Sequence, residues 1–191
     1  MKRLYGEPTD TEIVQVYMPT SSHSEEEKEE VYEQLKEVTG AAKGEENIIV
    51  IGYWNAVVGE SREGRSVGQF GLGKRTPAGE SLIEFCNEKN MVGANTLFEQ
   101  HRRRRYTRKM PGDRTRYQIE YIHVRTRYRN KVKQCKSYPG ADINCDHKLF
   151  VMDSQLRYKK IKELTQEPRW NTQMLEENRQ EKSSPRPLPE N

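Results

Sequence analysis

Short runs of β-branched residues predict the strands in the first half of the chain. Residues 48–52 (Ile-Ile-Val-Ile-Gly) are continuous and apolar, which is typical of a strand that is buried on both faces and ends at Gly52. Residues 11–18 hold a second run, and Pro19 ends it because proline has no N–H for the sheet. Residues that directly follow a buried strand lie at the rim of the sheet, where sites in layered α/β proteins gather. The segment 53–55 (Tyr-Trp-Asn) is therefore a candidate site.

Apolar residues at helical spacing predict two helices, at about 25–39 and 78–90. The first helix begins at a capping box formed by Ser24 and Glu27, and the second begins at Thr76-Pro77. The predicted buried stripes are Val31, Leu35 and Val38 in the first helix and Leu82, Ile83, Phe85 and Cys86 in the second. The order of strand, helix, strand and helix predicts a layered α/β (α+β) domain.

The second half of the chain predicts shorter and more polar elements. Glycines mark 59–79 as a long loop, and it lacks the pattern of a nucleotide-binding P-loop. Strands are predicted at 91–95, 106–107, 117–124 and 149–156, with a turn at 110–113. Alternate charges in 125–136 predict a strand with one face in solvent.

Composition limits the domain organisation. The chain has 191 residues, of which 32% are apolar and 32% are charged, and its mean hydropathy is −1.07. These values predict an irregular start at 1–10, one domain at 11–160 and a polar, disordered tail at 161–191. No apolar run is long enough for a membrane span, the start has no signal-peptide core, and three cysteines without a CxxC pair predict free thiols. We therefore expect an intracellular protein, nuclear or cytoplasmic, with no membrane partner.

Positive charge is concentrated in the middle of the chain. Residues 99–136 hold 14 basic against 3 acidic residues, an excess of 11, although the whole chain has a net charge of only +4. Such a segment favours a polyanion partner such as the DNA or RNA backbone. A solvated basic face that binds nothing explains the charge equally well.

Taken in order along the chain, several motifs resemble the endonuclease/exonuclease/phosphatase superfamily, which has the DNase I-like fold. The closer resemblance is to the endonuclease of RTE-type non-LTR retrotransposons and its craniofacial development protein 2-like relatives. The residues that carry it are QVYMPTS at 15–21, IIVIGYWNAVVGE at 48–60, a glycine-rich stretch and helix at 67–98, RYTRKMPGDRTRYQIEYI at 105–122 and GADINCDHKLFV at 140–151. The resemblance covers about 12–160 and implies a layered β-sandwich flanked by helices.

The resemblance implies metal-dependent hydrolysis of DNA phosphodiester bonds. In that family Mg²⁺ (or Mn²⁺) is held by carboxylates beside the scissile phosphate. Tyr17 is similar to the tyrosine that contacts phosphate, and Asn55 to the asparagine that positions the nucleophile and phosphate. Glu120 occupies the place of the aspartate that partners the histidine, Asp146 that of a metal or water ligand, and His147 that of the phosphate-binding histidine. Basic residues that would line the DNA groove are Arg102, Arg103, Arg104, Arg105, Arg108, Lys109, Arg114 and Arg116.

Two departures from the family pattern weigh against activity. The signature aspartate is Tyr53 here, and a phenol with a pKa of about 10 neither binds Mg²⁺ well nor accepts a proton readily at neutral pH. The family also begins with strands that bear an asparagine and the main metal-binding glutamate, and the resemblance implies that this chain starts after both, with the fold incomplete at its N-terminus. Two smaller changes are Cys145 for a supporting serine and Arg108 for a tryptophan.

Three interpretations follow from these residues. The first is a degenerate, truncated phosphodiesterase, a pseudoenzyme or an enzyme with residual Mg²⁺-dependent nuclease activity. The second is a non-catalytic, basic nucleic-acid-binding or interaction module, with a protein partner at the sheet edge that missing strands would expose. The third is a gene fragment with no stable product.

Overall fold

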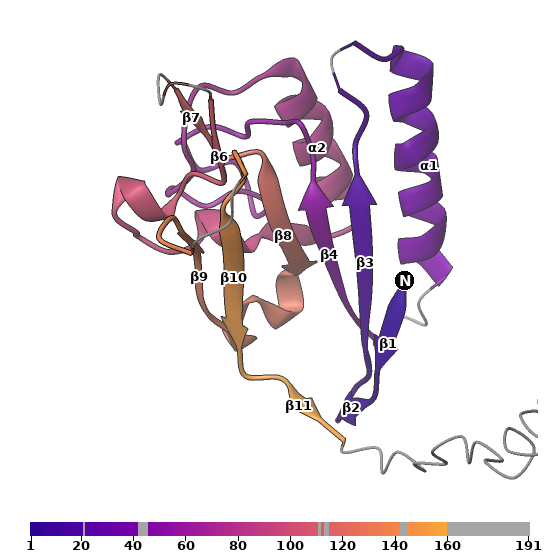
Figure 1. Ribbon diagram of the computed structural model, residues 1–191. Coiled ribbons are helices and arrows are strands. Elements are labelled where there is room, and N and C mark those ends of the chain that lie inside the picture. The colour runs from indigo at the N-terminus through magenta and orange to yellow at the C-terminus, as the bar shows by residue number, and fades with distance from the viewer. Residues whose placement is uncertain (21, 42–45, 111, 113–114, 142–144, 160–191) are drawn as a thin grey trace, which may run out of the picture. The chain divides into compact units, whose positions relative to one another are not determined.

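The computed structural model describes residues 1–159 except 21, 42–45, 111, 113–114 and 142–144 (Figure 1). The predicted tail at 161–191 lies outside the described residues. The strands are β1 Lys2–Leu4, β2 Gly6–Glu7, β3 Thr11–Tyr17, β4 Asn47–Tyr53, β5 Met91–Gly93, β6 Arg108–Lys109, β7 Arg116–Tyr117, β8 Glu120–Arg125, β9 Val132–Tyr138, β10 Leu149–Ser154 and β11 Arg157–Tyr158. The helices are α1 Glu25–Ala41 and α2 Pro77–Glu88, with 3₁₀ turns η1 Ala94–Thr96, η2 Arg102–Arg104 and η4 Thr126–Lys131.

A five-stranded mixed sheet lies at the centre, in the order β1-β3-β4-β8-β5. Strands β3 and β4 are parallel, whereas β1 pairs with β3, and β8 with β4 and β5, in antiparallel fashion. Separate two-stranded pairs join β9 to β10, β6 to β7 and β2 to β11.

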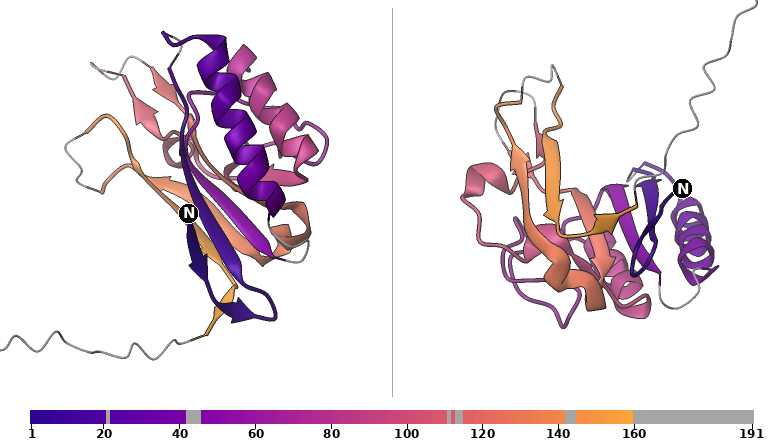
Figure 2. Two further views of the ribbon diagram at one scale, coloured as in Figure 1. Left: turned by 90° about the vertical axis from the view of Figure 1, so that its right-hand side faces the viewer. Right: turned by 90° about the horizontal axis from the view of Figure 1, so that it is seen from below.

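The two faces of the central sheet are covered by different layers. On one face, Ile48 and Val50 of β4 pack in a cluster with Leu35 of α1 and Leu82 of α2. On the other face, Ile49 packs in a second cluster that includes Val132 and Cys135 of β9 and Phe150 and Met152 of β10. Figure 2 shows this arrangement, with the helices on one side of the sheet and the β9–β10 pair on the other. Because successive β4 residues enter opposite clusters, the strand is buried on both faces, as its sequence predicted.

Both helices begin where the sequence predicted. In α1 the capping box is present, because Glu27 N–H donates to Ser24 Oγ (3.2 Å) and Ser24 N–H donates to the Glu27 carboxylate (3.0 Å). In α2 the hydroxyl of Thr76 accepts from Gly79 N–H (3.2 Å), and Pro77 occupies the first turn. The predicted apolar stripes face the core in both helices.

Four local predictions were wrong. Residues 2–4 form strand β1 where an irregular start was predicted, and Tyr106-Thr107 precedes β6 as buried coil. The single strand predicted at 117–124 is divided, because β7 ends at Tyr117 and β8 begins at Glu120. The first half of 125–136 is the 3₁₀ turn η4, and only its second half, in β9, is a strand.

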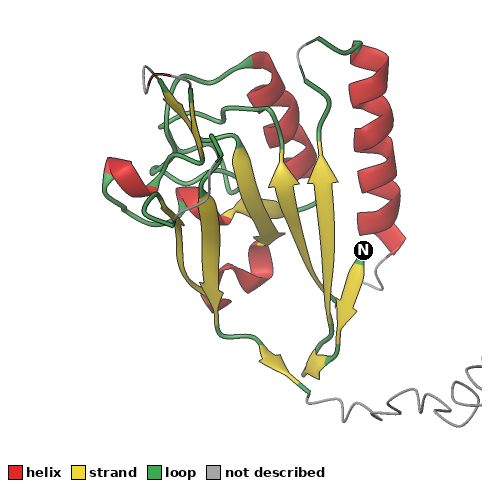
Figure 3. Cartoon of the chain, in the orientation of Figure 1, coloured by secondary structure: helices red, strands yellow, loops and turns green. Residues whose placement is uncertain are grey.

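Gly52 allows β4 to lie close to β3. Its φ of +152° is one that residues with a Cβ rarely adopt, and a Cβ built there would lie 1.9 Å from the main-chain oxygen of Val16. The strands therefore approach each other closely at their carboxyl ends. Figure 3 shows that loops from several elements gather beyond those ends, at the upper edge of the sheet. We call this edge the rim.

Candidate functional site

Sheet register places three of the predicted site residues side by side at the rim. Tyr17 of β3 is the register partner of Tyr53 in β4, and Tyr53 is in turn the register partner of Glu120 in β8. Strand β3 runs parallel to β4, and β8 runs antiparallel to it. The C-terminal ends of β3 and β4 therefore lie beside the N-terminal end of β8. Three residues that lie up to 103 positions apart in the sequence thus share one edge.

The β6–β7 hairpin and the loop before β10 bring the remaining members of the cluster. Arg108 forms an isolated bridge with His147. Two main-chain hydrogen bonds flank it, from Lys109 N–H to the carbonyl of Asp146 (2.8 Å) and from Lys148 N–H to the carbonyl of Thr107 (2.7 Å). These bonds hold the loop that carries Asp146 and His147 against the hairpin.

Arg108 lies at the centre of the cluster. Its Nε donates a 2.8 Å hydrogen bond to Oδ2 of Asp146, and its Nη1 donates a 3.0 Å hydrogen bond to the hydroxyl oxygen of Tyr53. The bond from Arg108 is the chief reason why the pKa of the Asp146 carboxyl is below its ordinary value, and the same bond raises the pKa of Arg108. Asp146 is therefore ionised at neutral pH and already paired with a cation of the chain itself.

His147 is paired with Glu120. Its Nδ1 donates to Oε1 of Glu120, and its Nε2 lies 3.6 Å from Oδ1 of Asp146. The second carboxylate oxygen of Glu120, Oε2, is buried and has no hydrogen-bond partner among the described residues. The predicted partnership of residue 120 with the histidine is thus geometrically available with glutamate in place of aspartate.

Two tyrosines form an aromatic surface beside these charges. The ring of Tyr53 stacks on the ring of Tyr17 with centroids 5.2 Å apart, and it meets the ring of His147 edge-on at 5.2 Å. Tyr17 is 70% exposed, whereas burial raises the pKa of the Tyr53 phenol despite the opposing effect of Arg108. Tyr53 is therefore protonated at neutral pH and offers a neutral hydroxyl at the rim.

Asn55 lies on the β3 side of the rim. It has a φ of +51°, a left-handed conformation that asparagine tolerates better than most residues, and its side-chain Nδ2 donates to the main-chain oxygen of Met18 (2.8 Å). Within the described residues, no hydrogen bond joins it to Arg108 or His147. Asn55 thus orients the start of the loop after β4.

The predicted nucleic-acid-binding residues fall into two groups. Arg108, Lys109 and Arg116 belong to the β6–β7 hairpin at the rim, whereas Arg102, Arg103 and Arg104 form the exposed turn η2. η2 packs beside β9. Arg105 lies over the ring of Phe70 (5.8 Å), and Arg116 over the ring of Tyr106 (4.9 Å), as cation–π contacts. Arg114 lies outside the described residues. The structure therefore does not gather the whole basic segment on the rim.

Two positioning residues were not foreseen from the sequence. The hydroxyl of Thr107 accepts hydrogen bonds from the N–H groups of Ile119 (3.1 Å) and Glu120 (3.2 Å). Buried Asn95 donates to the carbonyl of Glu120 (2.8 Å) and accepts from Ile122 N–H (3.2 Å). Together they fix the main chain that carries Glu120. The local sequence does not predict these roles, because Thr107 and Asn95 bond to main-chain groups of residues 119–122, which are distant from them in sequence.

The described residues at the rim do not fit a divalent metal ion. Mg²⁺ prefers several carboxylate or water oxygens in an octahedral arrangement. Here Asp146, the one metal ligand that the sequence predicts, is bound to Arg108, one oxygen of Glu120 is bound to His147, and the neighbouring Tyr53 offers only a neutral hydroxyl. A guanidinium at the centre also repels a cation. Nowhere in the described part of the chain do three His, Cys, Asp or Glu side chains gather to hold a metal.

The three cysteines are free thiols, as predicted. Cys86 and Cys135 are buried, and burial raises the pKa of both thiols. Cys145 is exposed, and its sulfur accepts a 3.1 Å hydrogen bond from His147 N–H. No described helix has the length and apolar composition that crossing a membrane requires.

Comparison with known proteins gives the chain curated relatives, although no protein-family model matches it. Craniofacial development protein 2 from Bos taurus is 40% identical over 163 residues, which are 85% of this chain and 28% of that protein. The same protein from Tragulus javanicus has the same identity and coverage. The chain thus spans less than a third of the length of the curated relatives it matches.

Solved structures with a similar fold come from one superfamily. The catalytic domain of Xenopus laevis APE2 has a TM-score of 0.57 at 14% identity, covering 83% of this chain and 55% of that chain. An endonuclease/exonuclease/phosphatase family protein from Leptotrichia buccalis has a TM-score of 0.53 at 14% identity, covering 82% and 52%. The 3′ phosphatase NExo from Neisseria, bound to product DNA hairpin, has a TM-score of 0.53 at 11% identity, covering 82% and 63%.

At these identities the likeness shows the fold alone, and it confirms the predicted fold class. The 40% identity adds a relationship in sequence that the structural likeness could not show. The chain is thus a homologue of a segment of craniofacial development protein 2, with the DNase I-like fold of the endonuclease/exonuclease/phosphatase superfamily over 52–63% of the length of these solved members.

Proposed function

We propose that this domain derives from a metal-dependent DNA phosphodiesterase, an endonuclease of retrotransposon type, and that it binds the nucleic-acid backbone with little or no hydrolysis. The observation that carries the proposal is the guanidinium of Arg108, held between the Tyr53 hydroxyl (3.0 Å) and Asp146 (2.8 Å). A fixed cation occupies the space where the ancestral chemistry needs carboxylates around a metal ion. With Asp146 paired and Tyr53 neutral, such a rim does not activate water.

Loss of hydrolysis follows from the proton chemistry of Tyr53. In-line attack on a phosphodiester requires a water that a base deprotonates or orients, and a protonated phenol provides no such base. Loss of a general base costs about 10²–10⁴ in rate, roughly 3–5 kcal/mol of barrier. The Glu120–His147 pair favours the alternative, residual Mg²⁺- or Mn²⁺-dependent cleavage, because that pair is intact.

Backbone binding is supported by exposed positive charge and by one structural neighbour. The three arginines of η2 are exposed, and the rim adds an exposed aromatic ring, Tyr17. Guanidinium groups bind phosphate oxygens in a bidentate manner, and aromatic rings stack on bases. The Neisseria phosphatase was solved with a DNA hairpin. These features are suited to the binding of a single- or double-stranded nucleic acid through its phosphate groups.

A plasmid-nicking assay with Mg²⁺ and with Mn²⁺ tests the catalytic half of the proposal. The expected result is nicking no faster than that of a matched His147→Ala preparation. Metal-dependent nicking by the wild type that His147→Ala abolishes would show that the site hydrolyses DNA, and would replace the proposal with the alternative above.

Fluorescence anisotropy with a short DNA duplex, in EDTA, tests the binding half. Three arginines that neutralise phosphates give a slope of log K against log salt of about −2.7. We expect the triple variant Arg102→Glu, Arg103→Glu, Arg104→Glu to lose most of that slope. A matched Arg62→Glu variant, which reverses an exposed arginine outside the basic segment, should bind like the wild type. A DNA affinity that does not change with salt concentration would contradict binding through the phosphate backbone.

A further inference from the structure

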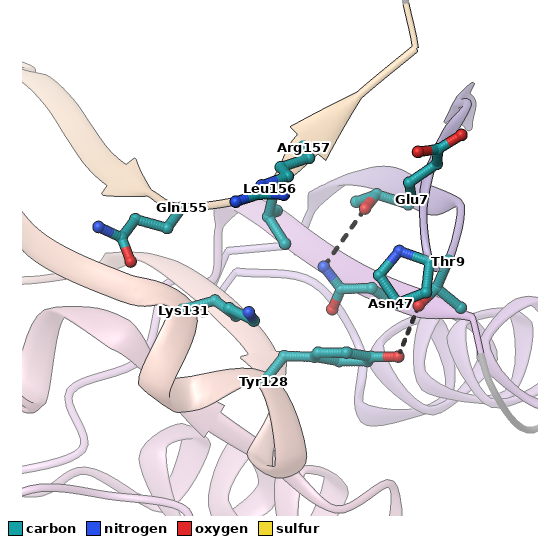
Figure 4. A pocket seen from close by; sticks show the side chains of 10 residues that line it. Glu7, Thr9, Asn47, Tyr128, Lys131, Gln155, Leu156 and Arg157 are labelled. Carbon is teal, nitrogen blue, oxygen red and sulfur yellow. Dashed lines mark hydrogen bonds between the residues drawn. The ribbon is translucent and has the colours of Figure 1, made fainter.

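A cavity of about 750 Å³ lies at the end of the sheet opposite the rim (Figure 4). Asn47, the first residue of β4, lines it, whereas Tyr53 at the other end of the same strand belongs to the rim. Strand geometry separates these residues by roughly 20 Å. The β2–β11 pair forms a wall, with Arg157 opposite Glu7 and Tyr158 opposite Gly6 in register. A hydrogen bond from Gln155 N–H to the carbonyl of Lys131 (2.8 Å) ties η4 to the segment before β11.

Asn47 carries an unused hydrogen-bond acceptor into this cavity. The residue is 2% exposed, and its Oδ1 is buried without a partner among the described residues. Its Nδ2 donates a hydrogen bond to Oγ1 of Thr11 (3.4 Å) on the other side of the amide. Figure 4 shows the oxygen on the side that faces Tyr128 and Lys131. A buried amide oxygen without a partner is unfavourable, so a ligand that donates an N–H here gains a hydrogen bond at an atom that is already desolvated.

The wall around Asn47 combines an aromatic ring with positive charge. Tyr128 lines the cavity, with its hydroxyl 3.3 Å from that of Thr9 and the guanidinium of Arg127 4.8 Å from its ring centroid. Lys131 and Arg157 lie at the border and, within the described residues, neither forms an ion pair. The single carboxylate of the lining, Glu7, pairs with Lys159 (3.5 Å). The cavity therefore offers an acceptor deep inside and uncompensated positive charge at its border.

From this combination we propose that the cavity binds a nucleotide, with an N–H of the base donating to Asn47 Oδ1 and the phosphate contacting Lys131 and Arg157. The base would lie along the wall that contains Tyr128 and Leu156. A volume of about 750 Å³ is within the range of small-molecule sites. The same chemistry is present in a free nucleoside monophosphate and in the phosphorylated end of a single strand. This site is separate from the rim and does not depend on the function proposed there.

NMR titration of the ¹⁵N-labelled full chain tests the site, because the side-chain NH₂ signals of Asn47 report directly on it. The probes are AMP, adenosine, ribose 5-phosphate and a 5′-phosphorylated tetranucleotide. We expect AMP to shift the Asn47 signals and to bind at least tenfold more tightly than adenosine or ribose 5-phosphate. Tighter binding of AMP than of the tetranucleotide would identify a free nucleotide as the ligand, and tighter binding of the tetranucleotide would identify the phosphorylated end of a strand.

The variant Lys131→Glu, Arg157→Glu should weaken AMP binding at least tenfold and leave adenosine binding unchanged. Both side chains are exposed, and the hydrogen bond of residue 131 is made by its main chain, so the fold should be retained. The variant Arg62→Glu, which reverses an exposed arginine outside the cavity, serves as the control and should bind AMP like the wild type. Ribose 5-phosphate binding as tightly as AMP, or Asn47 signals that neither AMP nor the tetranucleotide moves at millimolar concentration, would overturn the proposal.

Discussion

The Arg108–Asp146 pair should make a measurable but modest contribution to stability. Its 2.8 Å bond joins two full charges, which favours a large value, but the two side chains are 32% and 39% exposed, so water screens them. Exposed pairs contribute about 0.2–1 kcal/mol, and hydrogen bonds to charged groups about 1.5–3 kcal/mol. Discounting for exposure, we expect a coupling free energy of about 1 kcal/mol, which is roughly 2–4 °C in Tm for a chain of this size.

A double-mutant cycle measures this coupling. The free energy of unfolding in urea is determined for Arg108→Ala, Asp146→Ala and the double variant. The pairing lowers the pKa of Asp146, so its stabilisation is complete above the ordinary aspartate pKa of about 4 and is lost as the pH falls through the lower, folded-state value. A coupling free energy near zero at pH 7, or one that persists when Asp146 is protonated, would refute the conclusion that Arg108 and Asp146 form a stabilising ion pair.

The matched control is the cycle of Arg108→Ala with Asp153→Ala. Asp153 lies in β10 and shares no hydrogen bond or ion pair with Arg108 among the described residues. The two effects should therefore add to within about 0.5 kcal/mol. A coupling in this control as large as in the test cycle would mean that the Arg108 substitution disturbs the fold generally.

Two further predictions concern the core. Burial lowers the pKa of His123 to about 3, so between pH 6.5 and 5 the unfolded state gains a proton that the folded state does not. The free energy of unfolding should therefore fall with decreasing pH, with a slope that rises from about 0.7 kcal/mol per pH unit at pH 6.5 to about 1.4 near pH 5. His123→Phe should flatten this slope in urea unfolding, and an unchanged slope would contradict the assignment. Gly52→Ala should destabilise the fold by about 3 kcal/mol or more, because its Cβ would meet the Val16 carbonyl at 1.9 Å. Gly140→Ala, with no atom within 4 Å of the added Cβ, should change the thermal unfolding midpoint little.

The elements that the sequence predicted well are those with local signals. The capping box at Ser24, the Thr76-Pro77 start and the β-branched run at 48–51 each act within a few residues, and each coincides with the element it predicted. The strand prediction at 117–124 failed because Thr107, from another segment, takes the N–H groups of Ile119 and Glu120 and interrupts the pairing. A tertiary contact overrode a regular local pattern there.

The candidate site was predictable as a list of residues but not as an arrangement. The resemblance placed Tyr53, Glu120, Asp146 and His147 at one rim, and the structure brings these four together. It could not predict that Arg108 joins Tyr53 to Asp146, because that contact links positions 38 and 55 residues apart through the β6–β7 hairpin. Tyr53 and Arg108, the two positions at which the resemblance implies a substitution, look independent in sequence. In space they form one interaction.

Binding of Mn²⁺ to the rim tests most directly the claim that a guanidinium occupies the place of a metal ion. Paramagnetic broadening of the amide signals of residues 120, 146 and 147 in the ¹⁵N-labelled chain is the measurement. We predict no selective broadening in the wild type at micromolar Mn²⁺, and selective broadening in the variant Tyr53→Asp, Arg108→Ala, which introduces a carboxylate and removes the cation. Selective broadening of these signals in the wild type would contradict the claim.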